Sequence, residues 1–303
     1  MWHVRRWLLS LAAVAAMLAT AYPASAQEQR TPEQLWGDFN HYMLIARPGL
    51  AAASGQELLD RTEPEQLLDA VEQGEYDNWE RTLEQATRTE AVQEVAQRLE
   101  NAIAEAKLAR ANNPERIRRN IQRLAEGQQA YTNAITRLRA AGQAAVPSML
   151  EVFTDEQQQQ LRPYVTTALV AMGRPAVYPL SVALPHVDGP TQQRLARVLA
   201  DIGYPMALPF LKQAIEDQQT DNAVREVLQR AFNQLAPGRD VSLDDDAAEL
   251  FRQLAADQYD SGNRGSLPGG YQMSDEQGVL WRYNPTAGLV AIGVPRAVFA
   301  DVL

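Results

Sequence analysis

A repeat of about 30 residues constrains the fold of this chain more than any other feature. Three stretches resemble one another, at residues 138–150, 169–180 and 199–211. Their glycines, Gly142, Gly173 and Gly203, follow one another at intervals of 31 and 30 residues. A unit of this length with one glycine break is typical of a pair of helices. Because such a unit cannot bury its apolar face alone, successive units are expected to stack.

The glycines and prolines of the repeat have sufficient structural explanations. Each glycine stands where one helix ends and the chain turns, so we expect a positive φ there. Pro147, Pro179 and Pro209 follow the three glycines. We expect them in the first turn of the next helix, where a missing N–H is harmless.

Residues 131–236 resemble HEAT-like repeats of the short, PBS-lyase type. The shared pattern has an Arg in the second helix, small residues and Leu, then Gly, then Ala-Val-x-Pro-Leu opening the next unit. Arg162 and Arg225 fit it, whereas Gln192 and Ala236 depart from it. The resemblance implies an all-α fold, a right-handed α-α superhelix of the armadillo type, and a role in binding other proteins. It implies no lyase activity, because the repeat is shared and not the catalysis.

Candidate interaction residues lie on the second helices of the repeats. We expect these exposed positions to contact a partner protein: Tyr164, Thr167, Arg194, Arg197 and Arg230. Arg162 and Arg225 are instead expected to form ion pairs with acidic groups of adjacent turns, as stacked repeats tend to offer.

Residues 1–26 have the pattern of a signal peptide. Arg5 and Arg6 precede an apolar stretch at residues 7–21, and Ala24-Ser25-Ala26 forms a small-x-small cleavage site. An uncleaved anchor is the alternative, but about fifteen apolar residues are short for a membrane span. We therefore expect export to the periplasm or beyond the cell, with a mature chain from Gln27 that has no stable membrane insertion.

Residues 27–130 are predicted to form an N-terminal helical region. Thr31 with Gln34 has the capping-box pattern, and the helix that follows is expected to stop at residues 47–49. Ser54 with Glu57 and Thr62 with Glu65 predict two more caps. A continuous helix is expected over residues 78–111, because no Gly or Pro interrupts its apolar stripe.

The repeats at 131–238 are followed by residues 239–303, which do not continue the repeat pattern. Ser242 with Asp245 is expected to cap one more helix. A turn-rich loop at residues 260–270 precedes two β-prone runs, 279–283 and 289–294, which predict a small hairpin. A helix is expected to open at Pro295. Because the apolar run ends abruptly at Leu303, we expect the chain to be a fragment or truncated there.

Composition excludes much chemistry. The chain has no Cys and three His, His3, His41 and His186, so thiolate sites and a His-rich metal site cannot be built. The net charge of -10 repels a phosphate backbone, which disfavours nucleic acid as a partner. The acidic run 244–246 lacks the alternating spacing of a calcium loop. We expect no cofactor and no metal.

Two functional hypotheses follow. The first is a non-enzymatic, exported scaffold that binds another protein through the second helices of the repeats; the sequence does not predict its oligomeric state. The alternative is an envelope enzyme or saccharide-binding module whose site lies where Trp281, Tyr283 and the loop at 260–270 meet the repeats. The first explains the repeats, whereas the second lacks a nominated nucleophile or acid.

Overall fold

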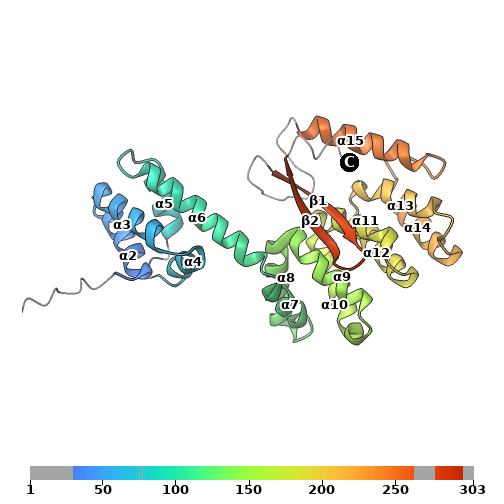
Figure 1. Ribbon diagram of the computed structural model, residues 1–303, viewed down its shortest axis with the longest axis horizontal. Helices are drawn as coiled ribbons and strands as arrows, with labels where there is room; N and C mark the ends of the chain where they lie inside the picture. The colour runs from blue at the N-terminus through green and yellow to red at the C-terminus, as the bar shows by residue number, and fades with distance from the viewer. Residues whose placement is uncertain (1–29, 75, 77, 263–276, 296–303) are drawn as a thin grey trace, which may run out of the picture. The chain divides into compact units, whose positions relative to one another are not determined.

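A computed structural model describes residues 30–74, 76, 78–262 and 277–295. Within these residues the chain is mostly helical, with a two-stranded antiparallel hairpin near the C-terminus (Figure 1). It divides into two compact units, of which the first ends at Lys107 and the second begins at Leu108. This division differs from the sequence boundary near residue 130. The expected signal segment and the helix after Pro295 lie outside the described residues.

The first unit is built from helices that enclose an aromatic centre. They are α2 (Pro32–Leu44), α3 (Pro48–Arg61), α4 (Pro64–Gln73), α5 (Trp79–Thr87) and the larger part of α6 (Gln93–Ala111). Trp36 and Phe39 of α2 are fully buried and stack with ring centroids 5.4 Å apart. Trp79 meets the Trp36 ring edge-on at 6.1 Å. These aromatic contacts tie α5 to α2.

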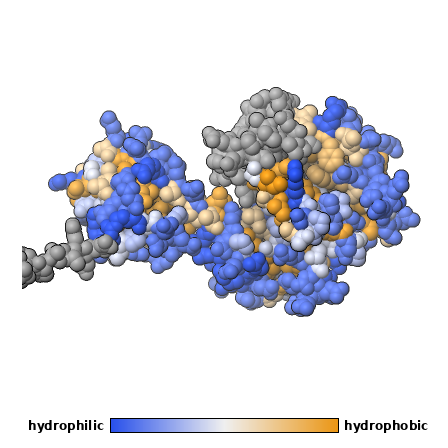
Figure 2. All heavy atoms as spheres, in the orientation of Figure 1, coloured by the Kyte–Doolittle hydropathy of each residue, from blue (hydrophilic) through white to orange (hydrophobic). Residues whose placement is uncertain are grey.

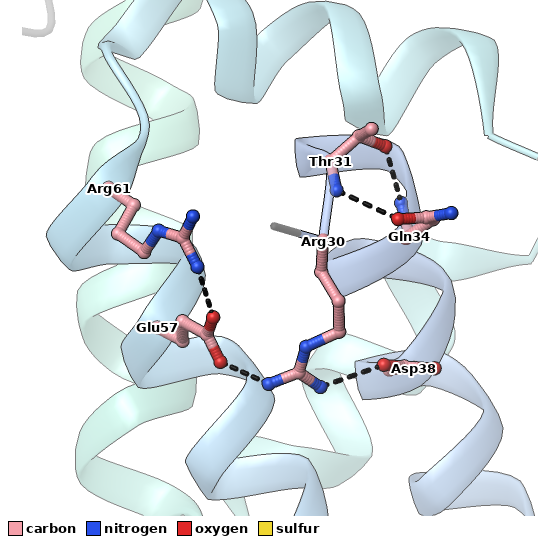
Figure 3. Close-up of polar contacts among 6 residues, drawn as sticks. All are labelled: Arg30, Thr31, Gln34, Asp38, Glu57 and Arg61. Atoms are coloured by element: carbon pink, nitrogen blue, oxygen red, sulfur yellow. Dashed lines mark hydrogen bonds and ion pairs between the residues drawn. The ribbon is translucent and has the colours of Figure 1, made fainter. Parts of the chain in front are cut away.

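The start of α2 is capped as predicted. The Thr31 hydroxyl accepts from the Gln34 backbone, and the Gln34 side chain accepts from the Thr31 backbone. Just before the cap, Arg30 bridges two helices: it lies 3.0 Å from the Asp38 carboxylate of α2 and also pairs with Glu57 of α3 (Figure 3). Glu57 pairs in turn with Arg61, so this surface network joins α2 to α3.

Two of the predicted caps are wrong. Ser54 is buried inside α3, and the helix starts at Pro48 instead. Glu63, and not Thr62, caps α4 and forms the capping box with Gln66. The prolines explain both shifts, because Pro is favoured at the first helical position and so sets where each helix begins.

The expected continuous helix over residues 78–111 is also broken, into α5 and α6, at residues 88–92. The Thr87 hydroxyl donates to the carbonyl of Glu84 at 2.8 Å, and the Thr89 hydroxyl donates to that of Gln85 at 2.9 Å. Threonine hydroxyls that bond nearby carbonyls compete with the helical ladder, so a helix can end without Gly or Pro.

Two glycines of the first unit differ in how closely other atoms surround them, so alanine substitutions at the two positions should have opposite effects on stability. A Cβ at Gly55 of α3 would lie 2.8 Å from Val95 Cγ1 and 3.1 Å from the Phe39 ring, whereas one at Gly37 of α2 would meet nothing within 4 Å. Gly55→Ala is expected to destabilise the unit by about 1–3 kcal/mol through overpacking. Gly37→Ala is expected to stabilise it by about 0.4–1 kcal/mol. Urea unfolding followed by tryptophan fluorescence would measure both, and equal effects would contradict the packing of α3 on α6.

The second unit contains the repeats. Its α-helices are α7 (Pro114–Arg123), α8 (Gln128–Ala141), α9 (Val146–Thr154), α10 (Arg162–Met172), α11 (Arg174–Ala183), α12 (Gly189–Ile202), α13 (Leu208–Glu216), α14 (Asn222–Leu235) and α15 (Ala247–Gly262). Short 3-10 turns precede several of them: η1 (Gly142–Ala145), η2 (Glu156–Leu161), η3 (Leu184–His186) and η4 (Pro205–Ala207). One continuous core runs from Ile117 of α7 to Leu289 of the hairpin.

The repeat helices stack in two layers (Figure 1). Helices α8, α10, α12 and α14 follow one another in one layer, and α9, α11 and α13 form the other. Side-chain amides tie α12 to α14: Gln193 donates to the Ala223 carbonyl at 3.3 Å, and Gln234 donates to that of Ala200 at 3.2 Å. Helix α15 packs on α13, where Phe251 meets Phe210 edge-on at 4.8 Å.

The repeat glycines have the positive φ that the sequence predicts, 55° at Gly142, 71° at Gly173 and 76° at Gly203. Pro147 and Pro209 lie in the first turn of α9 and α13, also as predicted. The prediction is wrong for Pro179, which lies inside α11. The reason is that α11 begins directly after its glycine, whereas a 3-10 turn delays the start of α9 and α13.

Arg162 and Arg225 play the same structural part in two repeats, and it differs from the expected ion pairs. Arg162 Nε donates to the Val152 carbonyl at 3.2 Å, and Arg225 Nε donates to the Ile215 carbonyl at 3.0 Å. Each acceptor lies ten residues upstream, near the end of the preceding helix. The last carbonyls of a helix lack partners within it and carry its negative dipole end. The guanidinium group donates hydrogen bonds to these carbonyls, and its positive charge interacts favourably with the negative end of the helix dipole.

The C-terminal segment forms the predicted hairpin. Strand β1 (Gln277–Asn284) pairs with β2 (Gly288–Pro295) in antiparallel register, with Trp281 opposite Ala291. The Asn284 side chain holds the turn by accepting from the Thr286 and Ala287 backbone. Upstream, Ser242 and Asp245 bond to each other but do not cap α15 directly; Asp246 accepts from the Ala248 backbone at its start.

Candidate functional site

The hairpin lies on the α9–α11 layer of the repeats, where Trp281 makes buried polar contacts. Strand β1 contacts α11, and β2 contacts α9. Trp281 is buried, and its Nε1 donates to Gln143 Oε1 at 2.6 Å. Gln143 is itself buried in the turn after α8. A buried pair of this kind fixes one docked position, because either group left alone loses its hydrogen bond.

Tyr178 of α11 lies under the same hairpin. Burial raises the pKa of its phenol to about 12, although a hydrogen bond from the Trp281 backbone and the charge of Arg282 act in the opposite direction. The side chain is 4% exposed. The neutral phenol is therefore the form that the folded protein favours.

The raised pKa of Tyr178 predicts a loss of stability at alkaline pH. The unfolded phenol releases its proton near pH 10 and the folded one near pH 12. Between these values the folded state binds more protons, so the free energy of unfolding falls as the pH rises. We expect a change from pH 9 to pH 11 to cost the wild-type chain about 1 kcal/mol more than Tyr178→Phe. Urea unfolding at both pH values would measure it, with the exposed Tyr164→Phe as the control.

The aromatic residues of the alternative hypothesis are engaged within the fold. The Trp281 ring is buried, and Tyr283 stacks on His186 with ring centroids 4.8 Å apart. Burial removes the Trp281 ring from the surface, and His186 covers one face of the half-buried Tyr283 ring. Most of the loop at 260–270 lies outside the described residues, so it adds no contact to the argument.

The opposite layer of the repeats carries the candidate interaction residues. We call the exposed side of α10, α12 and α14 the α10–α14 surface, defined by Tyr164, Thr167, Arg194, Arg197 and Arg230. Tyr164 is 42% exposed, Arg194 is half-buried, and the other three are exposed. The Thr167 hydroxyl and Arg230 Nε bond only to carbonyls of their own helices.

Three of these residues occupy equivalent places. Thr167 lies six residues before Gly173, Arg197 six before Gly203, and Arg230 six before the corresponding Ala236. Because α10, α12 and α14 stack in one layer, the exposed side chains at this equivalent position of the three helices form a row. The sequence suggested these three positions as contact residues but not their equivalence, and it missed Gln143 and Tyr178. The only signal for Gln143 was a polar residue among alanines in a turn.

Two hollows of the described surface are lined by charged side chains. One, of about 540 Å³, lies at the turn between α7 and α8 and is polar; its lining includes Arg123, Gln128 and Arg137. The other, of about 280 Å³, lies between α5 and α6, where Lys107 stands 4.8 Å from the Trp79 ring centroid. The second hollow also holds Glu80, whose carboxylate lies 4.0 Å from Lys107 Nζ.

Metal-binding and membrane-spanning features were sought in the part of the chain that the structure describes. There, no group of three or more His, Asp or Glu side chains is placed to hold a metal ion. In the same residues, no helix has both the length and the apolarity of a membrane span. His41 stands beside Tyr42, and His186 stands beside Tyr283.

No family model, no curated protein and no solved structure matches this chain.

Proposed function

We propose that this chain is a non-enzymatic scaffold of HEAT-like repeats that binds another protein through the α10–α14 surface. The observation that supports the proposal most directly is the row formed by Thr167, Arg197 and Arg230, which repeats one exposed position along stacked helices. A row of this kind suits an extended partner that contacts several repeats at once.

The superhelical form is part of the proposal. Paired helices, glycine turns at regular intervals and the recurring arginine cap of Arg162 and Arg225 support an array of stacked short repeats, for which we propose a right-handed superhelix. The opposite, α9–α11 layer carries the chain's own hairpin, which leaves the α10–α14 surface as the accessible layer for a partner. Export through the N-terminal segment would place this surface in the periplasm or outside the cell.

Site-specific photocrosslinking tests the proposal. A benzoyl-phenylalanine at Tyr164 is expected to crosslink the full chain to one protein in its native exported fraction. The same group at Leu50, which is 47% exposed in the first unit, is the matched control. Arg197→Glu and Arg230→Glu should each lower the yield at Tyr164 by about tenfold or more if the surface is the contact. Equal crosslinking from Leu50, or a yield that neither charge reversal changes, would contradict the proposal.

A further inference from the structure

The charge of this chain is strongly segregated. Residues 108–142 hold seven arginines and two glutamates, a net charge of +5, whereas the whole chain carries -10 and residues 30–107 carry -9. The basic segment comprises the end of α6, both α7 and α8, and the turn between them. Such a cluster stands out because the rest of the surface repels anions.

Besides Arg116, five of these arginines are exposed on α7 and α8. They are Arg118, Arg119, Arg123, Arg137 and Arg139, which we call the arginine surface. Within the described residues none of the five guanidinium groups forms an ion pair. Figure 2 shows the surface over α7 as hydrophilic, while apolar residues gather at the hairpin. Like charges held close together without partners repel one another, so an anion that binds among them relieves this repulsion.

A hollow at the turn between the two helices lies next to part of this positive charge. Arg123, the last residue of α7, and Arg137 of α8 both line it. Gln128, Gln129 and Asn133 add side-chain amides, and Glu126 also lies in the lining. Guanidinium groups bind carboxylates through paired hydrogen bonds, and amides offer both donors and acceptors.

We propose that the arginine surface and its hollow bind an acidic polypeptide segment of a partner protein. Arg123 and Arg137 receive a carboxylate, and the amides of the hollow pair with the peptide's main-chain N–H and C=O groups. A phosphate polymer has mostly acceptors and would leave the amide oxygens of the hollow without donors. A lipid surface would require several exposed apolar side chains beside the charges, whereas Leu108 of α6 is the single large exposed apolar residue that the structure describes within residues 108–142.

This surface shares no residue with the α10–α14 surface, so variants of one leave the other unchanged and the two proposals can fail independently. A fluorescein-labelled peptide of alternating Glu and Ser is the probe, with a Lys-Ser peptide as the charge control. Anisotropy titration of the full chain at 50 mM salt should show binding of the Glu peptide, weakening as salt rises. The double variant Arg123→Gln with Arg137→Gln is expected to weaken it by about tenfold or more.

Two matched variants distinguish binding in the hollow from attraction by the overall positive charge of the arginine surface. Arg118→Gln with Arg139→Gln removes the same charge outside the lining of the hollow and is expected to weaken binding by about two- to threefold. Arg81→Gln, an exposed arginine on α5 of the first unit, should have no effect. Circular dichroism melts would show that each variant remains folded. Equal losses in both double variants would overturn the role of the hollow. Tighter binding of polyphosphate or of phosphatidylglycerol vesicles than of the Glu peptide would overturn the polypeptide assignment.

Discussion

Trp281→Ala is expected to lower the free energy of unfolding of the second unit by about 3–5 kcal/mol. The ring is 5% exposed beneath the hairpin, and its removal leaves a cavity against α11. It also leaves the Gln143 side-chain oxygen without the 2.6 Å hydrogen bond that it accepts from Trp281. The loss should lower the thermal midpoint of this unit by roughly 10 °C, measured by circular dichroism.

Controls on the same hairpin distinguish anchoring from a general effect of mutation. Val290→Ala changes a side chain that is 37% exposed, and we expect less than about 0.5 kcal/mol. Trp281→Phe keeps an aromatic ring but loses the N–H, so it should cost an intermediate amount, and adding Gln143→Leu should recover part of it. If Trp281→Ala were as mild as Val290→Ala, the docked position of the hairpin would be wrong.

The second large effect is expected from Arg225→Ala, about 2–3 kcal/mol. Its guanidinium group donates to the carbonyls of Ile215, Asp217 and Thr220 at 2.9–3.0 Å. Without it, these carbonyls at the end of α13 lose the group that satisfies them. Urea unfolding gives the overall change, and hydrogen exchange of the α13 amides should show it locally.

Arg230 provides the matched control for Arg225, since it lies on the same helix and bonds only to the Glu226 carbonyl of its own helix, at 3.3 Å. Arg230→Ala should change stability by less than about 0.5 kcal/mol. Arg225→Lys keeps the charge but not the planar fork, so we expect it to recover little. Full recovery by lysine would mean that charge alone, and not the fork of hydrogen bonds, stabilises the end of α13.

Local signals were reliable where one residue type suffices to determine the backbone. The positive φ of the repeat glycines, the Thr31 cap and the hairpin turn at Asn284 were all predicted. Where several local signals competed, the prediction failed. Ser54 had a capping pattern, but Pro48 placed it inside a helix, and the hydroxyls of Thr87 and Thr89 bond carbonyls where a continuous helix was expected.

The sequence alone determined the paired helices and their turns, because glycine, proline and the apolar period act over a few residues. The segregation of charge around α7 and α8 is likewise present in the order of the residues. Only the tertiary structure decided that the hairpin lies on the α9–α11 layer, because the contact of Trp281 with Gln143 joins residues 138 positions apart. Arg225 bonds to carbonyls only five to ten residues upstream, but the recurring arginine did not reveal whether it would meet these carbonyls or an acidic side chain. Such contacts depend on which surfaces meet, and no local pattern encodes that.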